Sequence, residues 1–173
     1  MKLEDLIAAV PDFPHPPILF RDITPLLASA AGLREAVLQM SERHRSAGVE
    51  LVAGIETRGL ILASAMAVEL GAGLIPIRKP GKLPREHLTR DYQLEYGTAT
   101  LELHSDAVRP GQKVLLVDDL LATGGTAAAA LDLLRTLRAE VVAACFLVEL
   151  VGLDGATALD GLPVISEIRL PEA

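Results

Sequence analysis

The chain has 173 residues, of which 50% are hydrophobic, and its formal net charge is −7. This length and apolar content predict a single domain, residues 1–173, whose core needs neither disulfides nor a structural metal. The acidic balance argues against a nucleic-acid-binding protein, and no apolar run approaches the roughly 18 residues of a membrane span, so we expect no contact with a membrane.

The N-terminal segment contains two acids and too short an apolar run for a signal peptide, so we expect a cytosolic protein. Residues 3–10 are predicted to form a short helix, and the prolines of residues 11–17 interrupt regular structure. Phe20 could then stack on a flat heterocycle that Arg21 orients. Taken alone, these residues slightly favour a different interpretation, in which the segment anchors the core and Arg21 forms a surface pair with Asp22.

A strand and a helix are predicted next, with a charged loop between them. A helix over residues 33–45 precedes a strand at 50–55, and a further helix at 60–70 follows Glu56, Thr57, Arg58 and Gly59. The start of a helix presents unpaired N–H groups, so an anion could bind there together with Arg58. Glu56 and Arg58 could equally form a surface pair.

A basic segment follows the predicted strand at residues 72–77. Residues 78–90 contain five basic side chains and one acid in an otherwise acidic chain. Their prolines and glycine predict a loop, and the strand expected at 98–104 would return it as a hairpin. We interpret residues 78–100 as a mobile lid that clamps a polyphosphate; the alternative is a flexible basic surface loop.

The strongest functional signal is the sequence VLLVDDLLATGGTA, which begins at Val114. Residues 114–117 predict a buried strand that Asp118 and Asp119 end, and a small-residue loop then leads into a helix at 127–134. Such a loop at a helix start binds phosphate, whereas the two carboxylates suit sugar hydroxyls or a divalent cation. The combination predicts a sugar-phosphate site; the alternative is a charged strand end before an ordinary turn.

The remaining segments complete an alternating pattern. Residues 141–150 predict a long buried strand, residues 152–161 a loop or short helix, and residues 163–170 a final strand. Cys145, the only cysteine, lies in the buried strand and is expected to be a core residue. The alternation of strands and helices predicts an α/β domain with a mostly parallel central sheet flanked by helices, whose sites lie at the carboxyl ends of the strands.

The VLLVDDLLATGGTA segment resembles the phosphoribosyl-pyrophosphate signature of the type I phosphoribosyltransferases, in the form found in adenine phosphoribosyltransferases. The segments PDFP, FRDITPLL, RKPGKLP and YQLEYG resemble the same family, so the likeness extends from Pro11 to about Leu150. It implies the type I fold with a mobile lid hairpin, and a small base-recognition hood to which the N-terminal arm, residues 1–30, contributes. It also implies transfer of phosphoribose to adenine, Mg²⁺ as cofactor, and a homodimer.

The resemblance assigns roles to individual residues. The residues expected to act in catalysis are Glu95, Arg58 and Lys79, and those expected to contact adenine are Leu19, Phe20, Arg21 and Leu150. The residues expected to bind phosphoribosyl pyrophosphate are Glu56, Thr57, Arg58, Arg78, Lys79, Lys82, Tyr96, Asp118, Asp119, Ala122, Thr123, Gly124, Gly125 and Thr126. Mg²⁺ is expected at Asp118 and Asp119, indirectly or through the substrate.

Two observations on the base follow from the same resemblance. Family members that act on 6-oxopurines commonly have an acid where this chain has Ala122, and a lysine beyond the signature strand, where residues 114–173 contain none. Adenine is therefore the expected substrate. The alternatives are a phosphoribosyltransferase for another base, or a non-enzymatic sensor of phosphoribosyl pyrophosphate, although the length and charge leave no room for a DNA-binding module.

Overall fold

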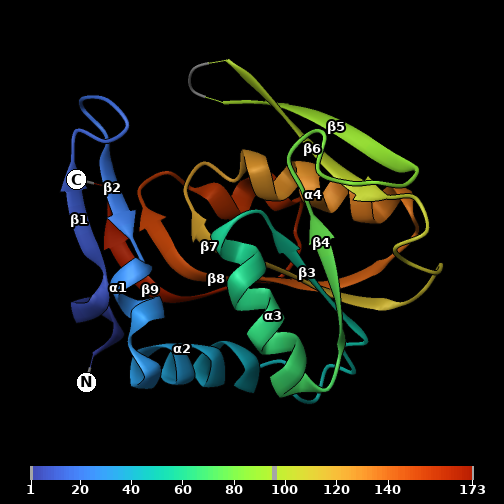
Figure 1. Cartoon of the computed structure of the whole chain (residues 1–173), viewed down its shortest axis with the longest axis horizontal. Helices are drawn as coiled ribbons and strands as arrows, with labels where there is room; N and C mark the ends of the chain where they lie inside the picture. The colour runs from blue at the N-terminus through green and yellow to red at the C-terminus, as the bar shows by residue number, and fades with distance from the viewer. Residues whose placement is uncertain (1, 95–96, 173) are drawn as a thin grey trace.

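The centre of the computed structural model is a five-stranded parallel sheet (Figure 1). The structure describes residues 2–94 and 97–172. In spatial order the strands are β4 (Gly73–Ile77), β3 (Leu51–Ile55), β7 (Lys113–Leu121), β8 (Glu140–Val151) and β9 (Val164–Pro171). This arrangement confirms the predicted α/β class with a mostly parallel sheet.

Helices cover both faces of the sheet, which explains the long apolar runs in its central strands. Helices α1 (Thr24–Ala28), α2 (Ala30–Glu42) and α3 (Arg58–Leu70) pack on one face, and α4 (Gly125–Thr136) packs on the other (Figure 1). Along β7, Leu115 and Val117 join the first core, whereas Val114 and Leu116 join the second. The apolar run of β7 is therefore explained by burial on both faces of the sheet.

The predicted hairpin is formed by β5 (His87–Gln93) and β6 (Thr98–His104), which pair antiparallel. It lies beside α4, outside the central sheet (Figure 1). Strand β5 begins at His87, so only the first part of the basic segment is a loop. The hairpin thus brings the second half of the predicted lid next to the signature helix α4.

The helix predicted at residues 3–10 is wrong beyond its first turn. A short 3-10 helix spans Leu3–Leu6, and the chain then enters strand β1 (Ala8–Pro11). This strand pairs antiparallel with β2 (Leu19–Asp22), so that Val10 lies opposite Phe20. Pairing with a distant segment outweighs the local preference for helix, and it builds a small separate sheet at one end of the molecule (Figure 1).

Three further differences concern the limits of elements. The signature strand continues through Asp118 and Asp119 to Leu121, because β7 keeps its pairing with β8 as far as Glu149. Helix α1 was not expected, and the loop or short helix predicted near the C-terminus contains a 3-10 helix, Gly155–Leu159. None of the helices within the described ranges has the length and apolar character needed to cross a membrane.

Candidate active site

Three neighbouring strands, β4, β3 and β7, end on the same side of the sheet and carry the charged groups of the site. Glu56, Thr57 and Arg58 follow β3, and Lys79 follows β4. Asp118 and Asp119 lie in β7 itself. Parallel strands therefore bring together segments that are far apart in the sequence, at the edge where ligands bind to open α/β sheets.

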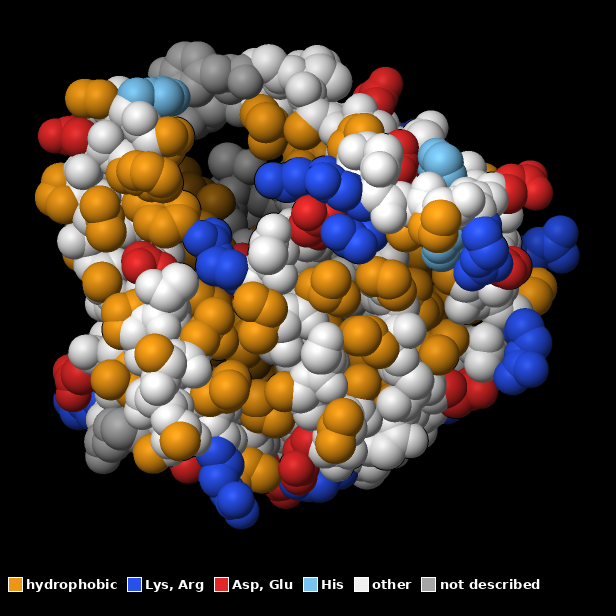
Figure 2. Space-filling view, viewed as in Figure 1, with side chains coloured by type: hydrophobic (Ala, Val, Ile, Leu, Met, Phe, Trp, Pro, Cys, Tyr) orange, Lys and Arg blue, Asp and Glu red, His pale blue; other side chains and the backbone are white. Residues whose placement is uncertain are grey.

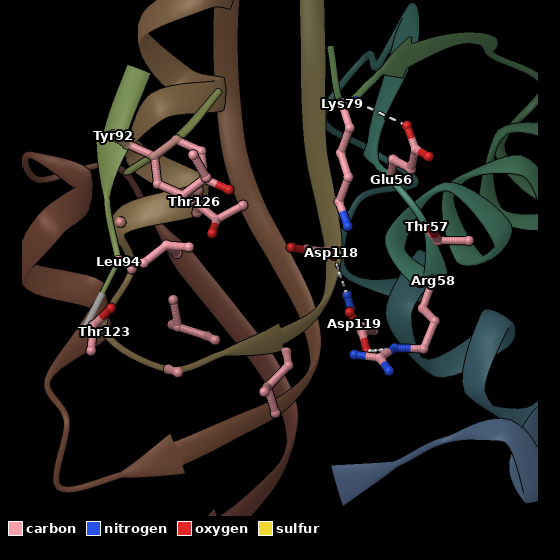
Figure 3. Close-up of a pocket in the computed structure, with 17 residues that line it drawn as sticks. Glu56, Thr57, Arg58, Lys79, Tyr92, Leu94, Asp118, Asp119, Thr123 and Thr126 are labelled. Atoms are coloured by element: carbon pink, nitrogen blue, oxygen red, sulfur yellow. Dashed lines mark hydrogen bonds and ion pairs between the residues drawn. The ribbon is translucent and has the colours of Figure 1, made fainter. Parts of the chain in front are cut away.

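A cavity of about 520 Å³ lies at this edge, within the range of roughly 300–1,000 Å³ that is typical of small-molecule sites. Figure 3 shows it from within, and Figure 2 shows a hollow between the small β1–β2 sheet and the β5–β6 hairpin. The lining residues are Glu56, Thr57, Arg58, Lys79, Tyr92, Leu94, Ala99, Asp118, Asp119, Leu120, Leu121, Ala122, Thr123, Gly124, Gly125, Thr126 and Ala127.

The start of α3 lies directly against β7 because residue 59 is a glycine. A Cβ atom there would lie 2.8 Å from the Asp118 Cα and 3.0 Å from the Val117 carbonyl oxygen. This close approach brings the Arg58 Nε within 2.5 Å of Asp119 Oδ2 (Figure 3). The two loops of the site are thus joined by an ion pair that is largely buried on the carboxylate side.

Asp118 is buried, with 9% of the residue exposed, and among the described residues no cation forms an ion pair with its side chain. Its Oδ1 accepts a hydrogen bond from the Asp119 N–H at 2.9 Å. Burial, followed by the negative charge of Asp119, raises the pKa of the Asp118 carboxyl well above its usual value. A partner that donates hydrogen bonds to the Asp118 carboxyl would therefore stabilise its ionised form.

Glu56 organises the cations that follow β4. Its Oε2 accepts hydrogen bonds from the Lys79 N–H and from the Arg78 Nε, both at 2.9 Å. Burial opposes ionisation, but these two bonds outweigh it and hold the pKa of the Glu56 carboxyl below its usual value. Arg78 is consequently occupied outside the cavity, whereas the Lys79 side chain extends into it toward Asp118 (Figure 3).

The loop before α4 lines the opposite side of the cavity with backbone and hydroxyl groups. Gly124, the residue before the helix, has φ +83, a conformation that favours glycine. Gly124 has no side chain that could cap the first turn of α4, which leaves the N–H groups of this turn to bind a ligand. Thr123 and Thr126 flank this turn and line the cavity (Figure 3). The arrangement suits a phosphate group.

The residues expected to contact the base do not line the cavity, although one of them adjoins it. The Phe20 ring lies 4.8 Å from the Arg58 guanidinium carbon and packs edge-on against Phe13. Arg21 instead donates a hydrogen bond to the Pro171 carbonyl at 2.8 Å, and Leu150 is buried in the core. Leu19 is half-buried in β2. Through its contact with Arg58, Phe20 adjoins the side of the cavity that Arg58 lines.

Not every expected residue lines the cavity, and several lining residues had been assigned no role. Lys82 is not among the residues that line the cavity, and Glu95 and Tyr96 lie outside the described residues. The lining residues without an assigned role come mostly from the hairpin and from the end of β7: Tyr92, Leu94, Ala99, Leu120, Leu121 and Ala127. Tyr92 is one of only two tyrosines, which is the one signal in the sequence that points to it.

The peptide bond between Glu56 and Thr57 is cis. Thr57 precedes α3 and makes no side-chain cap to the helix. Together with Arg58, it forms the wall of the cavity that faces the signature loop (Figure 3).

Known proteins similar to this chain agree on one family. A profile described as phosphoribosyl transferase domain matches residues 22–158. An adenine phosphoribosyltransferase of Thermosynechococcus vestitus is 52% identical over 95% of this chain and 96% of its own. The crystal structure of the Thermoanaerobacter pseudethanolicus enzyme has a TM-score of 0.94 and 44% identity, and covers 98% of this chain and 100% of that one.

A third likeness comes from a structure with ligands. The adenine phosphoribosyltransferase of Saccharomyces cerevisiae, complexed with an imino-altritol bisphosphate and adenine, has a TM-score of 0.88 and 34% identity over 95% of both chains. The matches cover nearly the whole chain, and the family profile includes every described residue of the cavity. This chain therefore belongs to the phosphoribosyltransferase family, and within it to the adenine phosphoribosyltransferases.

Proposed function

We propose that this protein transfers the phosphoribosyl group of phosphoribosyl pyrophosphate to N9 of adenine, producing AMP and pyrophosphate in purine salvage. The observation that carries the proposal is a single cavity with an anion-binding loop on each side and two carboxylates between them. This set of groups suits a ribose that carries phosphate at one end and pyrophosphate at the other. The yeast relative, whose complex contains adenine and a bisphosphate, supports the same assignment.

The 5′-phosphate is assigned to the loop of Thr123, Gly124, Gly125 and Thr126. The free N–H groups of the first turn of α4 and the positive end of its dipole favour an anion there. The two threonine hydroxyls can donate further hydrogen bonds. Because this group lies away from the reacting carbon, its binding energy serves to fix the ribose in position.

Asp118 and Asp119 are assigned to the ribose hydroxyls. Hydroxyl donors would stabilise the ionised form of Asp118, whose pKa burial raises in the free protein. Asp119 is paired with Arg58, and a pyrophosphate next to Arg58 would draw the guanidinium toward itself. Binding of the substrate would thereby release Asp119 to accept a hydrogen bond from the sugar.

The pyrophosphate is assigned to Glu56, Thr57, Arg58 and Lys79. In the reaction the bond from C1′ to the pyrophosphate oxygen breaks and its electron pair remains on the leaving group. Lys79 extends into the cavity where this negative charge develops, so its ammonium group would stabilise the transition state more than the ground state (Figure 3). Arg78 would act indirectly, by holding Glu56, and Lys82 would join the anion only if the loop closes.

The base is assigned to the space beside Phe20, between the small sheet and Arg58. As N9 bonds to C1′, its proton must leave, and by family resemblance Glu95 would receive or relay it. Leu19, Arg21 and Leu150 would shape this region, Arg21 through its bond to the backbone at Pro171. Tyr92 would close the hairpin side of the cavity and help to exclude water, and Tyr96 is assigned by family resemblance to binding of phosphoribosyl pyrophosphate.

Mg²⁺ is proposed as the cofactor. Across residues 2–94 and 97–172, no three His, Cys, Asp or Glu side chains are grouped as metal ligands. Because Mg²⁺ is usually bound by one or two carboxylates together with substrate phosphates, the substrate would supply part of its ligands. Asp118 and Asp119 would hold it through the ribose hydroxyls. When bound, Mg²⁺ neutralises charge on the pyrophosphate.

A homodimer in the cytoplasm is also proposed. Ile61 and Val68 lie one above the other on α3 and are 43% and 84% exposed, and Leu74 on the neighbouring edge strand β4 is 41% exposed. Hydrophobic side chains spread across this face (Figure 2). A second copy of the chain would cover them. Sedimentation of the protein and of Val68→Asp tests this: a monomeric native protein would contradict it.

The activity is tested by incubating the protein with phosphoribosyl pyrophosphate and Mg²⁺ in the presence of adenine, hypoxanthine, xanthine, guanine or orotate, and measuring the release of pyrophosphate. We expect release with adenine. Turnover with another base and none with adenine would replace the proposed substrate. Binding of phosphoribosyl pyrophosphate without turnover of any base would favour a sensor.

A further inference from the structure

Glu102 is a buried acid that lies outside the cavity. It belongs to β6, on the side of the hairpin next to β4, and only 6% of the residue is exposed. A buried carboxylate is costly unless it accepts hydrogen bonds or pairs with a cation. The hydrogen bonds and ion pair of Glu102 are therefore what stabilises its buried charge.

These contacts hold the turn that follows β4. The Glu102 N–H donates to the Arg78 carbonyl at 2.7 Å, and the Arg78 N–H donates to the Glu102 carbonyl at 2.9 Å. The carboxylate then reaches further along the turn, where Oε2 accepts a hydrogen bond from the Gly81 N–H at 3.1 Å. Glu102 thus binds both ends of the segment 78–81.

Lys79 lies between these two points. Its own N–H is bound by Glu56 at 2.9 Å, on the cavity side of the turn. The backbone around Lys79 is therefore fixed by one carboxylate from the β3 loop and one from β6, and its side chain is left to extend into the cavity (Figure 3). Without Glu102, the Gly81 end of the turn would lose its side-chain anchor.

The same carboxylate also contacts the start of β5. The His87 Nε2 lies 3.5 Å from Glu102 Oε1, and the His87 Nδ1 is held by the Arg85 carbonyl at 2.8 Å. Glu102 therefore joins the two ends of the loop that leads from β4 into the hairpin. Its backbone position is fixed by the pairing of the hairpin.

We propose that Glu102 is a positioning residue for the pyrophosphate cation Lys79: by binding the Arg78 backbone and the Gly81 N–H, it fixes the turn that directs the Lys79 ammonium into the cavity. This inference rests on the proposed function, in which Lys79 stabilises the leaving group. It predicts that the contribution of Glu102 to the reaction passes entirely through Lys79.

A double-mutant cycle tests the proposal with steady-state kinetics. Glu102→Ala should lower kcat/KM for phosphoribosyl pyrophosphate about tenfold, the effect of losing a hydrogen bond to a charged group, while the KM for adenine stays unchanged. In a Lys79→Ala background, the same substitution should have almost no further effect. Glu102→Gln, which keeps an acceptor for the Gly81 N–H, should restore most of the loss.

Two additional variants control for stability. Thr100→Val removes the hairpin bond from the Thr100 hydroxyl to Asp91 at 2.6 Å and leaves the turn intact, so its kinetics should match those of the native protein. If Glu102→Ala does not fold, Glu102→Asp carries the same test, because the shorter side chain keeps its charge but loses its reach to Gly81. Thermal melting is measured for each variant.

Additive losses in the Glu102 and Lys79 variants, or a loss no larger than that of Thr100→Val, would overturn the proposal. Calorimetry of phosphoribosyl pyrophosphate binding, measured without a base, distinguishes a failure of this proposal from a failure of the proposed function. A native protein that binds this ligand but transfers nothing to adenine would refute the proposed activity. The role of Glu102 could then still be decided by a double-mutant cycle of Glu102 and Lys79 variants in which the affinity for phosphoribosyl pyrophosphate is measured.

Discussion

Gly59→Ala examines the contact on which the site depends, between the start of α3 and β7. The new Cβ would lie 2.8 Å from the Asp118 Cα, whereas ordinary contacts begin at 3.4 Å, so the two backbones must separate by about 0.6 Å. Overpacking of this kind costs about 1–3 kcal/mol, and the better helix propensity of alanine returns at most about 1 kcal/mol. We expect a net destabilisation of about 1–2 kcal/mol.

The effect on activity should be larger than this destabilisation implies. The separation would pull Arg58 away from Asp119, and displacements approaching 1 Å cost about a hundredfold in rate. We therefore expect kcat/KM for phosphoribosyl pyrophosphate to fall about ten- to a hundredfold. Steady-state kinetics and urea denaturation measure the two effects independently.

Gly32→Ala is the matched control, because it also lies in the first turn of a helix. Its Cβ would meet the end of the Leu6 side chain at 2.5 Å, a flexible group that can move aside. Its kinetics should equal those of the native protein. If Gly59→Ala is as stable and as active as Gly32→Ala, the close contact between α3 and β7 is not what positions Arg58.

Three further predictions concern single side chains. Asp118→Asn should raise the free energy of unfolding while lowering activity. This gain in stability should grow as the pH rises above 3.8, because the raised pKa of Asp118 makes the folded state bind the proton more tightly than the unfolded state. Denaturation curves in which the gain in stability shrinks with rising pH would contradict this prediction. Phe20→Ala should raise the KM for adenine about tenfold through loss of the ring beside Arg58, and an equal rise for both substrates would argue against a base-stacking role. Cys145 is buried and its thiol pKa is raised by burial, so a thiol reagent should label it only after unfolding; rapid labelling of the native protein would disprove its burial.

The main elements of the fold could be predicted because their sequence patterns are local. The apolar runs of β7 and β8 and the helices α2, α3 and α4 follow from periodicity. The N-terminal strand β1 could not be predicted, since Val10 gains its strand conformation only by pairing with Phe20. The end of β7 was misplaced for the same reason: pairing with β8 carries the strand past its two acids.

The candidate site shows a similar division. Loops next to strand and helix ends, such as Thr123–Thr126, were predicted to face a ligand, and they line the cavity. The basic segment was predicted as one group, yet its members differ: Lys79 faces the cavity, whereas Arg78 binds Glu56. Composition reveals that cations are present, but only tertiary packing decides which of them is already paired.

The order of the strands also has a consequence for folding. The site spans β3 and β7, and Leu51 pairs with Val114 from far later in the chain, whereas the β5–β6 hairpin pairs residues that are close in sequence. Pairings between distant segments form slowly, because the intervening chain loses entropy before contacts compensate for it. During refolding the hairpin should therefore become protected from hydrogen exchange early, while catalytic activity returns only when β7 has docked against β3.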